Sequence, residues 1–144
     1  MQSQFYTLTV CGLDSLPQAR LIRQEVFVEE QGFHNEFDDT DSRALHVLVL
    51  EGENPAATGR TFCDKGGKVW HMGRISVRKP YRGKQLGRMV MTELEKAAVA
   101  HGAEKLVLSA QVQAVGFYQK LGYTVCSGEY LDEHCPHVDM EKSI

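Results

Sequence analysis

The feature that most constrains the fold is a basic, glycine-containing turn with the sequence RGKQLGR at residues 82–88. The residues just before it, 75–77, predict the end of a strand, and the apolar run that begins at Met89 predicts a helix. The first amides of a helix have no partner within the helix, and the helix dipole favours an anion beside them. The segment therefore predicts a phosphate-binding strand–turn–helix unit, with a solvated turn as the plainer alternative.

Two common nucleotide-binding motifs are absent from this sequence. It contains no GxxxxGK[ST] segment, so we do not expect a P-loop nucleoside triphosphatase. It also contains no GxGxxG segment after a predicted strand, so we do not expect a dinucleotide-binding Rossmann domain. The predicted anion site must belong to another kind of fold.

Composition predicts one domain over residues 1–144, located in the cytoplasm. An apolar fraction of 42% supports an ordinary core, and no stretch approaches the ~20 apolar residues of a membrane helix. The first residues have neither a charged region nor an apolar signal core. The four cysteines are scattered and form no CxxC pair, which favours reduced thiols (Cys11, Cys63, Cys126 and Cys135).

The charges are divided between two segments of opposite sign. Residues 65–88 carry eight of the 16 Lys and Arg and no acid, whereas residues 25–41 carry seven acids and no Lys or Arg. This separation predicts ligands of opposite sign, or one ligand for each segment, with two solvated surfaces as the alternative. The pI of about 6.1 and the few aromatics among the cations argue against nucleic-acid binding.

The periodicity predicts an α+β fold with a mixed, mostly antiparallel central sheet flanked by helices. Three apolar runs, at residues 44–50, 56–63 and 69–77, are separated by turns at 52–55 and 65–68, which indicates an antiparallel meander. Residues 31–42 have no periodicity and predict an exposed loop, with a loop containing a short helical turn as the alternative. The other expected strands are 5–10, 106–108, 123–126 and 138–141, and the expected helices begin near Pro17, follow the glycine turn to about Ala100, and span 113–121.

Two motifs in this order resemble the GCN5-related N-acetyltransferase (GNAT) family over nearly the whole chain. The first, [Q/R]xxGx[G/A] after a strand, is matched by Arg82 and Gly87, while Gln85 replaces its central glycine. The second, NxxAxx[F/Y]Y, is matched at Ala114, Phe117 and Tyr118, with Gln111 in place of its Asn. The resemblance implies the GNAT-like acyl-CoA acyltransferase fold.

A closer resemblance is to the bacterial subgroup of ElaA-like and YjcF-like proteins. It depends on IRxxVFVxEQ at residues 22–31 and on PHVxM at residues 136–140. Many members of this subgroup lack an assigned acceptor. The resemblance therefore identifies the acyl donor more closely than it identifies the acceptor.

The resemblance implies acetyl-CoA as the donor and assigns residues to it. Backbone amides of the turn would hold the pyrophosphate, and nearby cations would add positive potential. The backbone of the preceding strand would pair with the pantetheine arm, and an N–H near a bulge of that strand would face the thioester oxygen. The expected binding residues are Ile75, Ser76, Val77, Arg82, Gly83, Lys84, Gln85, Leu86, Gly87, Arg88, Gln111, Ala114 and Phe117.

Two catalytic residues are expected from the same resemblance. Tyr118 would give a proton to the leaving thiolate, with core packing beside Phe117 as the alternative. Glu30 would act as the base, with an exposed carboxylate or a partner of Arg23 as alternatives. His46 and His71 on predicted strands could instead act through water, although a strand histidine is more often structural.

No metal is expected in this protein. His134, Cys135 and His137 lie within four residues around Pro136, but they cannot easily all reach one ion, and no second ligand pair has zinc spacing. We expect His137 to make a structural hydrogen bond instead.

These observations favour an N-acetyltransferase that moves an acetyl group from acetyl-CoA to a primary amine of a small molecule or basic side chain. The acidic segment 25–41 suggests a cationic acceptor. One alternative is an acyl-CoA-binding sensor or assembly module without turnover. The two replaced motif residues, Gln85 and Gln111, favour this alternative. Another is acyl transfer in the manner of the acyl-homoserine-lactone synthases. A homodimer remains open.

Overall fold

Eight strands form one sheet in the order β1-β2-β3-β4-β5-β8-β6, with β7 paired to β8. The computed structural model describes residues 4–144. The strands are β1 (Phe5–Cys11), β2 (Leu45–Glu51), β3 (Asn54–Cys63), β4 (Val69–Val77), β5 (Lys105–Gln111), β6 (Thr124–Val125), β7 (Tyr130–Asp132) and β8 (Cys135–Ser143). Among the strand pairs of the described residues only β4–β5 is parallel, so the expected mixed, mostly antiparallel sheet and its meander are confirmed.

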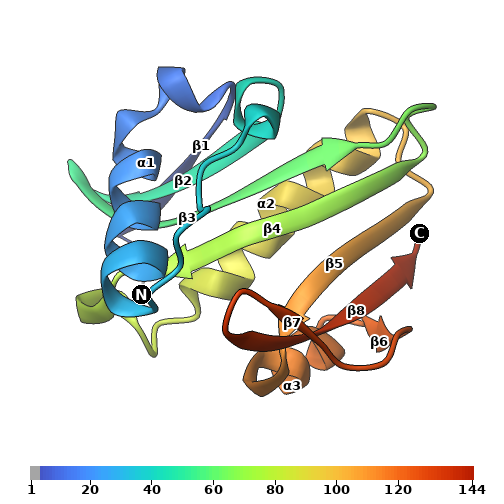
Figure 1. The fold of residues 1–144 in the computed structure, drawn as a ribbon. Helices are drawn as coiled ribbons and strands as arrows, with labels where there is room; N and C mark the ends of the chain where they lie inside the picture. Colours follow the sequence, from blue (N-terminus) through green and yellow to red (C-terminus); the bar gives the residue numbers. More distant parts are fainter. Residues whose placement is uncertain (1–3) are drawn as a thin grey trace.

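Helices cover both faces of the sheet. Helix α1 (Pro17–Arg23) packs with Leu48 and Leu50 of β2, whereas α2 (Leu86–Ala100) packs in the cluster that contains Val47 and Val49. Because side chains alternate along a strand, these two pairs point to opposite faces, and so do the helices they contact (Figure 1). The short α3 (Val115–Lys120) lies near β5 and β6.

The predicted elements differ from the structure mainly between residues 24 and 42 and near the C-terminus. Helix α1 continues as a π-helical segment, Gln24–Glu30, that the periodicity did not indicate. The expected exposed loop at 31–42 is wrong for Phe33, Glu36 and Asp41, which are buried. Strand β7 was not expected, β6 is only two residues long, and β8 is longer than predicted because it pairs with β5, β6 and β7.

Strands β4 and β5 diverge halfway along their length, and this divergence positions the site (Figure 1). They pair only from Val69 to Met72 of β4. Beyond that point β4 carries a bulge, where the register against β3 jumps and two residues face the single Gly59. A Cβ at Gly59 would lie 2.6 Å from Val90, so the missing side chain lets α2 pack closely behind the bulge.

Among residues 4–144 no helix is both long and apolar enough to cross a membrane. All four cysteines have free thiols, as the sequence predicted.

Candidate active site

Two cavities open where β4 and β5 separate. One has a volume of about 620 Å3 and lies against the N-terminus of α2, and the other has a volume of about 440 Å3 and lies between β4, β5, β8 and the π-helical segment. Ile75, Ala114 and Tyr118 line both. We name the first the donor cavity, after the residues that the resemblance assigned to the donor, and the second the acceptor cavity, as its counterpart; the two meet at these three shared side chains.

The donor cavity gathers most of the residues that the resemblance assigned to the donor. They come from two stretches of chain, 75–88 and 114–121. Two expected residues lie elsewhere: Lys84 is exposed and does not line the cavity, and Gln111 lines the acceptor cavity. The expected residues that line the donor cavity are Ile75, Ser76, Val77, Arg82, Gly83, Gln85, Leu86, Gly87, Arg88, Ala114 and Phe117.

The N-terminus of α2 is shaped by backbone conformation. Gln85, the residue before the helix, has φ 62° and makes no side-chain cap, and Gly83 has φ 80°. Gln85, which stands where the family motif has glycine, therefore adopts the left-handed backbone conformation that favours glycine. The neighbouring Gly83 is also left-handed, but it does not relieve Gln85 of that conformation. Gly87 has a different role, because a Cβ there would lie 3.3 Å from Cζ of Phe117. The absence of a side chain at Gly87 brings α2 and α3 together at the cavity.

Arg82 is held by an acid at the edge of the donor cavity. Its guanidinium donates two hydrogen bonds to the Glu30 carboxylate, at 2.7 and 2.8 Å, and Nε donates to the Val77 carbonyl at 3.0 Å. The hydrogen bond from Arg82 lowers the pKa of Glu30. Glu30 lines neither cavity. A carboxylate paired in this way is a weaker base, so the geometry gives little support to the expected catalytic role of Glu30.

Tyr118 lies at the junction of the cavities with its hydroxyl free. Within residues 4–144 no side chain or backbone group forms a hydrogen bond with Tyr118 Oη, while the ring packs edge to face on Phe117 and Tyr123. Burial raises the pKa of Tyr118 to about 12. The hydroxyl therefore stays protonated over the physiological range and can donate a hydrogen bond to a ligand at the junction.

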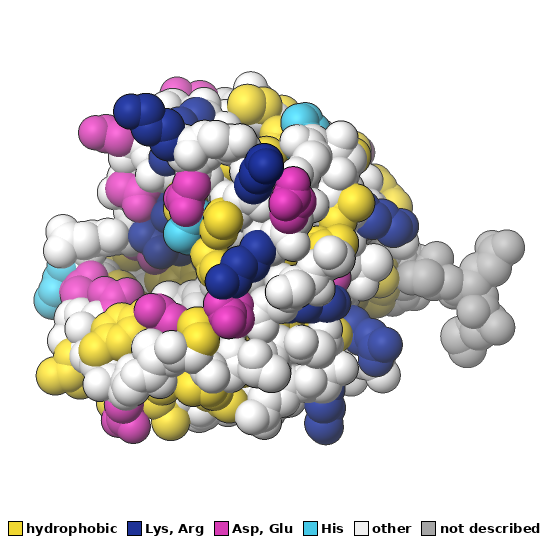
Figure 2. All heavy atoms as spheres, turned by 90° about the vertical axis from the view of Figure 1, so that its right-hand side faces the viewer, with side chains coloured by type: hydrophobic (Ala, Val, Ile, Leu, Met, Phe, Trp, Pro, Cys, Tyr) yellow, Lys and Arg dark blue, Asp and Glu magenta, His cyan; other side chains and the backbone are white. Residues whose placement is uncertain are grey.

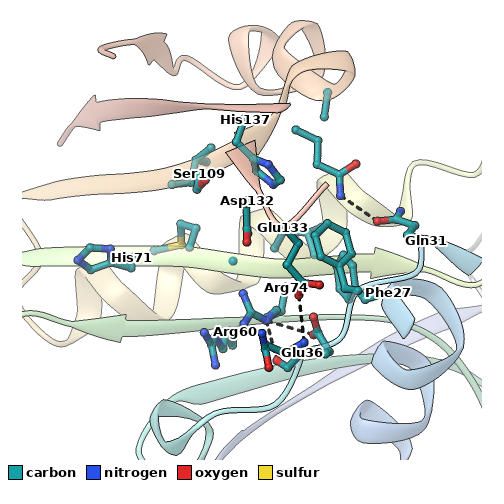
Figure 3. A pocket seen from close by; sticks show the side chains of 18 of the residues that line it. Phe27, Gln31, Glu36, Arg60, His71, Arg74, Ser109, Asp132, Glu133 and His137 are labelled. Atoms are coloured by element: carbon teal, nitrogen blue, oxygen red, sulfur yellow. Dashed lines mark hydrogen bonds and ion pairs between the residues drawn. The ribbon is translucent and has the colours of Figure 1, made fainter. Parts of the chain in front are cut away.

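Glu36, Arg60 and Arg74 form the floor of the acceptor cavity (Figure 3) and belong to a network of three arginines and three acids. Arg23 is fully buried and bonds Glu36 at 2.8 Å and Asp41 at 2.7 Å. Arg60 bonds Asp41 at 2.8 Å and Asp38 at 2.7 Å. Arg74 bonds Glu36 at 3.1 Å. The formal charges of these six groups cancel, which is the condition under which so many ions can be buried together.

Burial and pairing shift the pKa values of this network in opposite directions. Burial acts to raise the pKa of Asp41, but Arg23 and Arg60 outweigh it and lower the value to about 2. Burial dominates at Glu36 and raises its pKa despite the neighbouring arginines. Asp41 therefore stays ionised at neutral pH, with its carboxylate between Arg23 and Arg60.

The two charged segments of the sequence bind each other, which corrects the expectation that they face separate ligands or solvent. Five of the seven acids in segment 25–41 pair with arginines, three of which belong to segment 65–88. On the face shown in Figure 2, basic and acidic side chains also lie among one another, and neither sign forms a large patch of its own. The acidic segment therefore no longer argues for a cationic acceptor. The pairs are Glu25–Arg78, Glu30–Arg82, Glu36–Arg23, Glu36–Arg74, Asp38–Arg60, Asp38–Arg74, Asp41–Arg23 and Asp41–Arg60.

The histidines of the sequence analysis lie in different surroundings. His46 is buried beneath the ion network, where Nε2 contacts the Asp41 carbonyl at 3.0 Å. His71 lines the acceptor cavity but is bonded to Asp64 at 2.6 Å. His137 also lines this cavity and makes the structural hydrogen bond expected of it, from Nδ1 to the Cys135 carbonyl at 2.8 Å. Among residues 4–144 no group of three or more His, Cys, Asp or Glu is placed to hold a metal.

Three residues other than glycine have positive φ in the described chain, and all three line a cavity. Arg74 (φ 53°) lies in the bulge of β4, Gln85 (φ 62°) precedes α2, and Glu133 (φ 53°) lies in the turn between β7 and β8. Backbone in this region is strained for these side chains, and such strain is concentrated at functional sites. Gln111 adds a contact across the acceptor cavity by donating to Gln31 at 2.8 Å.

Comparison with known proteins agrees with this geometry. A family model described as "Acetyltransferase (GNAT) domain" matches residues 15–144. The "Uncharacterized N-acetyltransferase YjcF" of Bacillus subtilis (strain 168) is 41% identical over 133 residues, covering 90% of this chain and 93% of its own.

Two solved structures share the fold. The crystal structure of Escherichia coli ElaA has a TM-score of 0.86 at 22% identity, covering 96% of this chain and 99% of its own. The acyl-homoserine lactone synthase BjaI, solved with SAM and isopentyl-CoA, has a TM-score of 0.82 at 16% identity, covering 97% of this chain and 83% of its own. At these identities the likeness concerns the fold alone.

Proposed function

Because the chain belongs to the GNAT acetyltransferase family, which uses acyl-CoA, we propose that it transfers an acetyl group from acetyl-CoA to a primary amine. The observation that carries the proposal is the meeting of the two cavities at Tyr118, whose hydroxyl has no partner among residues 4–144. A volume of about 440 Å3 suits a small amine or the end of a basic side chain. The proposal includes a cytoplasmic location and leaves a homodimer open.

The donor cavity fits the phosphate and pantetheine parts of acetyl-CoA. The first-turn amides of α2 have no side-chain cap, and Arg88 lines the cavity beside them. Beyond Met72 no strand among residues 4–144 pairs with the edge of β4 that faces β5, so backbone near Ile75 and Ser76 on that edge is available to amides of the donor. The wall of this cavity is otherwise mainly apolar, from Phe117, Leu86 and Leu121.

We assign the proton for the leaving group to Tyr118. Attack by the amine nitrogen on the thioester carbonyl forms the C–N bond, and the C–S bond breaks with its electron pair on sulfur. Sulfur takes the hydroxyl proton of Tyr118, and the nitrogen, which loses a proton on becoming an amide, restores it. The bulge at Arg74 lies beside this junction and exposes backbone that could face the thioester oxygen.

The decisive experiment measures binding and turnover separately. Acetyl-CoA should raise the melting temperature, since a ligand that binds only the native state stabilises it. Thiol release should then depend on the presence of amine. A melt that does not move at saturating acetyl-CoA would remove the proposal. Binding without amine-dependent release would instead favour the non-catalytic sensor or assembly module.

A variant at the N-terminus of α2 locates the pyrophosphate. Gly87→Val places branched carbons where a Cβ alone would already lie 3.3 Å from Phe117, so the folded variant should lose the acetyl-CoA shift. Gly116→Ala is the matched control, because a Cβ there meets nothing within 4 Å, and it should keep the shift. If Gly87→Val binds normally, the pyrophosphate lies elsewhere.

A further inference from the structure

His137 enters the acceptor cavity from β8, opposite the arginines and Glu36 of its floor (Figure 3). Its exposed fraction is 5%, so the ring is held inside the protein. It pairs with Gln111 of β5 in the antiparallel register, which places both side chains on the cavity side of the sheet. Tyr130 stacks on the ring, and Phe33 contacts it edge to face.

The hydrogen bond of His137 determines which ring nitrogen carries the proton. Nδ1 lies 2.8 Å from the Cys135 carbonyl oxygen, which can only accept, so Nδ1 must be the donor. In the neutral ring the lone pair is then on Nε2. Within residues 4–144 no group forms a hydrogen bond with Nε2. The hydrogen bond from Nδ1 to the Cys135 carbonyl therefore also leaves Nε2 of His137 as a proton acceptor without a partner among residues 4–144.

We propose that Nε2 of His137 is the general base that takes a proton from the acceptor amine. This inference rests on the proposed acetyl transfer and adds a residue that the sequence analysis treated as structural. An ammonium cannot attack a thioester, so the acceptor must lose one proton before the C–N bond forms. His137 receives that proton and passes it to solvent, which accounts for the proton that the overall reaction releases.

Two carboxylates of the acceptor cavity are less suited to this step, and Nε2 of His71, the other imidazole there, is already bonded to Asp64 at 2.6 Å. Glu36 is bound by Arg23 and Arg74, and the Glu133 carboxylate accepts backbone hydrogen bonds from His34 and Asn35. An imidazole is a stronger base than a carboxylate. The charged or titratable groups around His137 are Glu36, Arg60, His71, Arg74, Tyr118, Tyr130, Asp132, Glu133, His134, Cys135 and Asp139.

The variant that tests this proposal is His137→Asn. The Asn amide can still donate from the position of Nδ1 to the Cys135 carbonyl, but it has no atom at Nε2. The matched control is His101→Asn, since His101 Nδ1 likewise bonds a main-chain carbonyl, that of Ala97, at 2.7 Å. His101 lies at the end of α2, on neither cavity.

Thiol release is measured from pH 6.5 to 9.5 with acetyl-CoA and a panel of amines: an amino sugar, a polyamine, an amino alcohol, an amino acid and a lysine peptide. We expect His137→Asn to lower kcat roughly 100-fold at pH 7 and less than about 10-fold at pH 9.5, where more of the amine is already neutral. The acetyl-CoA melting shift should be kept. His101→Asn should match the unaltered protein throughout.

Several outcomes would overturn the base assignment while leaving acetyl transfer intact. One is amine-dependent release by His137→Asn at the normal rate. Another is a loss of rate that is the same at every pH, which indicates a structural role. A third is a nitrogen-edited NMR spectrum of the unaltered protein with the ring proton on Nε2. Absence of amine-dependent release from the unaltered protein would instead overturn both proposals.

Discussion

The donor and acceptor cavities share three residues, yet they are built in different ways. The donor cavity is lined by two stretches of chain, 75–88 and 114–121, and its character comes from backbone conformation at the start of α2. The acceptor cavity is lined by side chains from the π-helical segment, the following loop, β3, β4, β5 and the β7–β8 hairpin. The shape of the donor cavity thus depends largely on backbone conformation at one helix end, whereas the acceptor cavity depends on the packing of many distant segments.

The acceptor side should therefore be more sensitive to loss of one buried charge. Asp41→Asn removes the carboxylate that bonds Arg23 at 2.7 Å and Arg60 at 2.8 Å, and so leaves buried cations without their partner. We expect the free energy of unfolding to fall by about 3–5 kcal/mol, measured by urea denaturation. The exposed neighbour Asp39, changed to Asn, should alter it by less than ~0.5 kcal/mol. If Asp41→Asn lowers the free energy of unfolding by less than ~1 kcal/mol, the ion network does not stabilise the fold around the acceptor cavity.

Acid should weaken the same network in the unaltered protein. The pKa of Asp41 is lowered from 3.8 to about 2, so its ionised form stabilises the fold above pH ~4. That contribution, on the order of 2 kcal/mol, is lost as the pH falls from ~4 through 2. Asp41→Asn should lack this part of the pH dependence, and an unchanged acid slope in the variant would show that Asp41 is not its source.

At the junction of the cavities, Tyr118→Phe separates chemistry from donor binding. The variant keeps the ring but loses the proton, so kcat should fall roughly 10- to 1,000-fold. The melting shift with acetyl-CoA should persist. Tyr123→Phe is the control, because Tyr123 Oη donates to Glu95 at 2.7 Å outside both cavities. A raised KM at constant kcat would show that Tyr118 only holds the donor. No change in either constant would show that the Tyr118 side chain only packs in the core.

On the donor side, the strain at Gln85 can be released without touching the acceptor cavity. With φ 62°, Gln85→Gly should raise the free energy of unfolding by roughly 0.5–1 kcal/mol, read from the urea midpoint. Gln119 in α3 has an ordinary helical backbone, so Gln119→Gly should lower it by a similar amount. Equal destabilisation by both changes would mean that Gln85 carries no strain.

The smallest expected effect concerns Glu30. If its carboxylate only holds Arg82, Glu30→Gln frees that guanidinium for phosphate, and the Kd for acetyl-CoA should fall roughly 2- to 5-fold at nearly constant kcat. Calorimetric titration and thiol release give the two quantities. Glu29→Gln, at an exposed neighbour, should leave both unchanged. A loss of kcat of more than ~10-fold in Glu30→Gln alone would restore Glu30 as the base.

The sequence could predict the elements whose signals are local. Alternation and turns predicted the β2–β3–β4 meander, and helical spacing predicted α2. The glycine turn predicted a phosphate site at the start of α2, which stays a prediction, and the family resemblance supplied most of the residues that line the donor cavity. Each of these rests on neighbours within a few residues, where backbone sterics and side-chain period decide the outcome.

Only the tertiary structure determined which residues line the acceptor cavity and which arginine pairs with which acid. Arg78 pairs with Glu25 across 53 positions and Arg82 with Glu30 across 52, and no local pattern says which of several arginines meets which acid. The direction and freedom of His137 likewise depend on β8 lying beside β5 and on a carbonyl two residues away. Composition showed that opposite charges were present, but only the folded chain fixed their pairing. Arg23 and Arg60 meet Asp41 in the interior, where charges interact strongly, whereas the more exposed pairs of Arg78 and Arg82 depend on the folded chain bringing distant segments together.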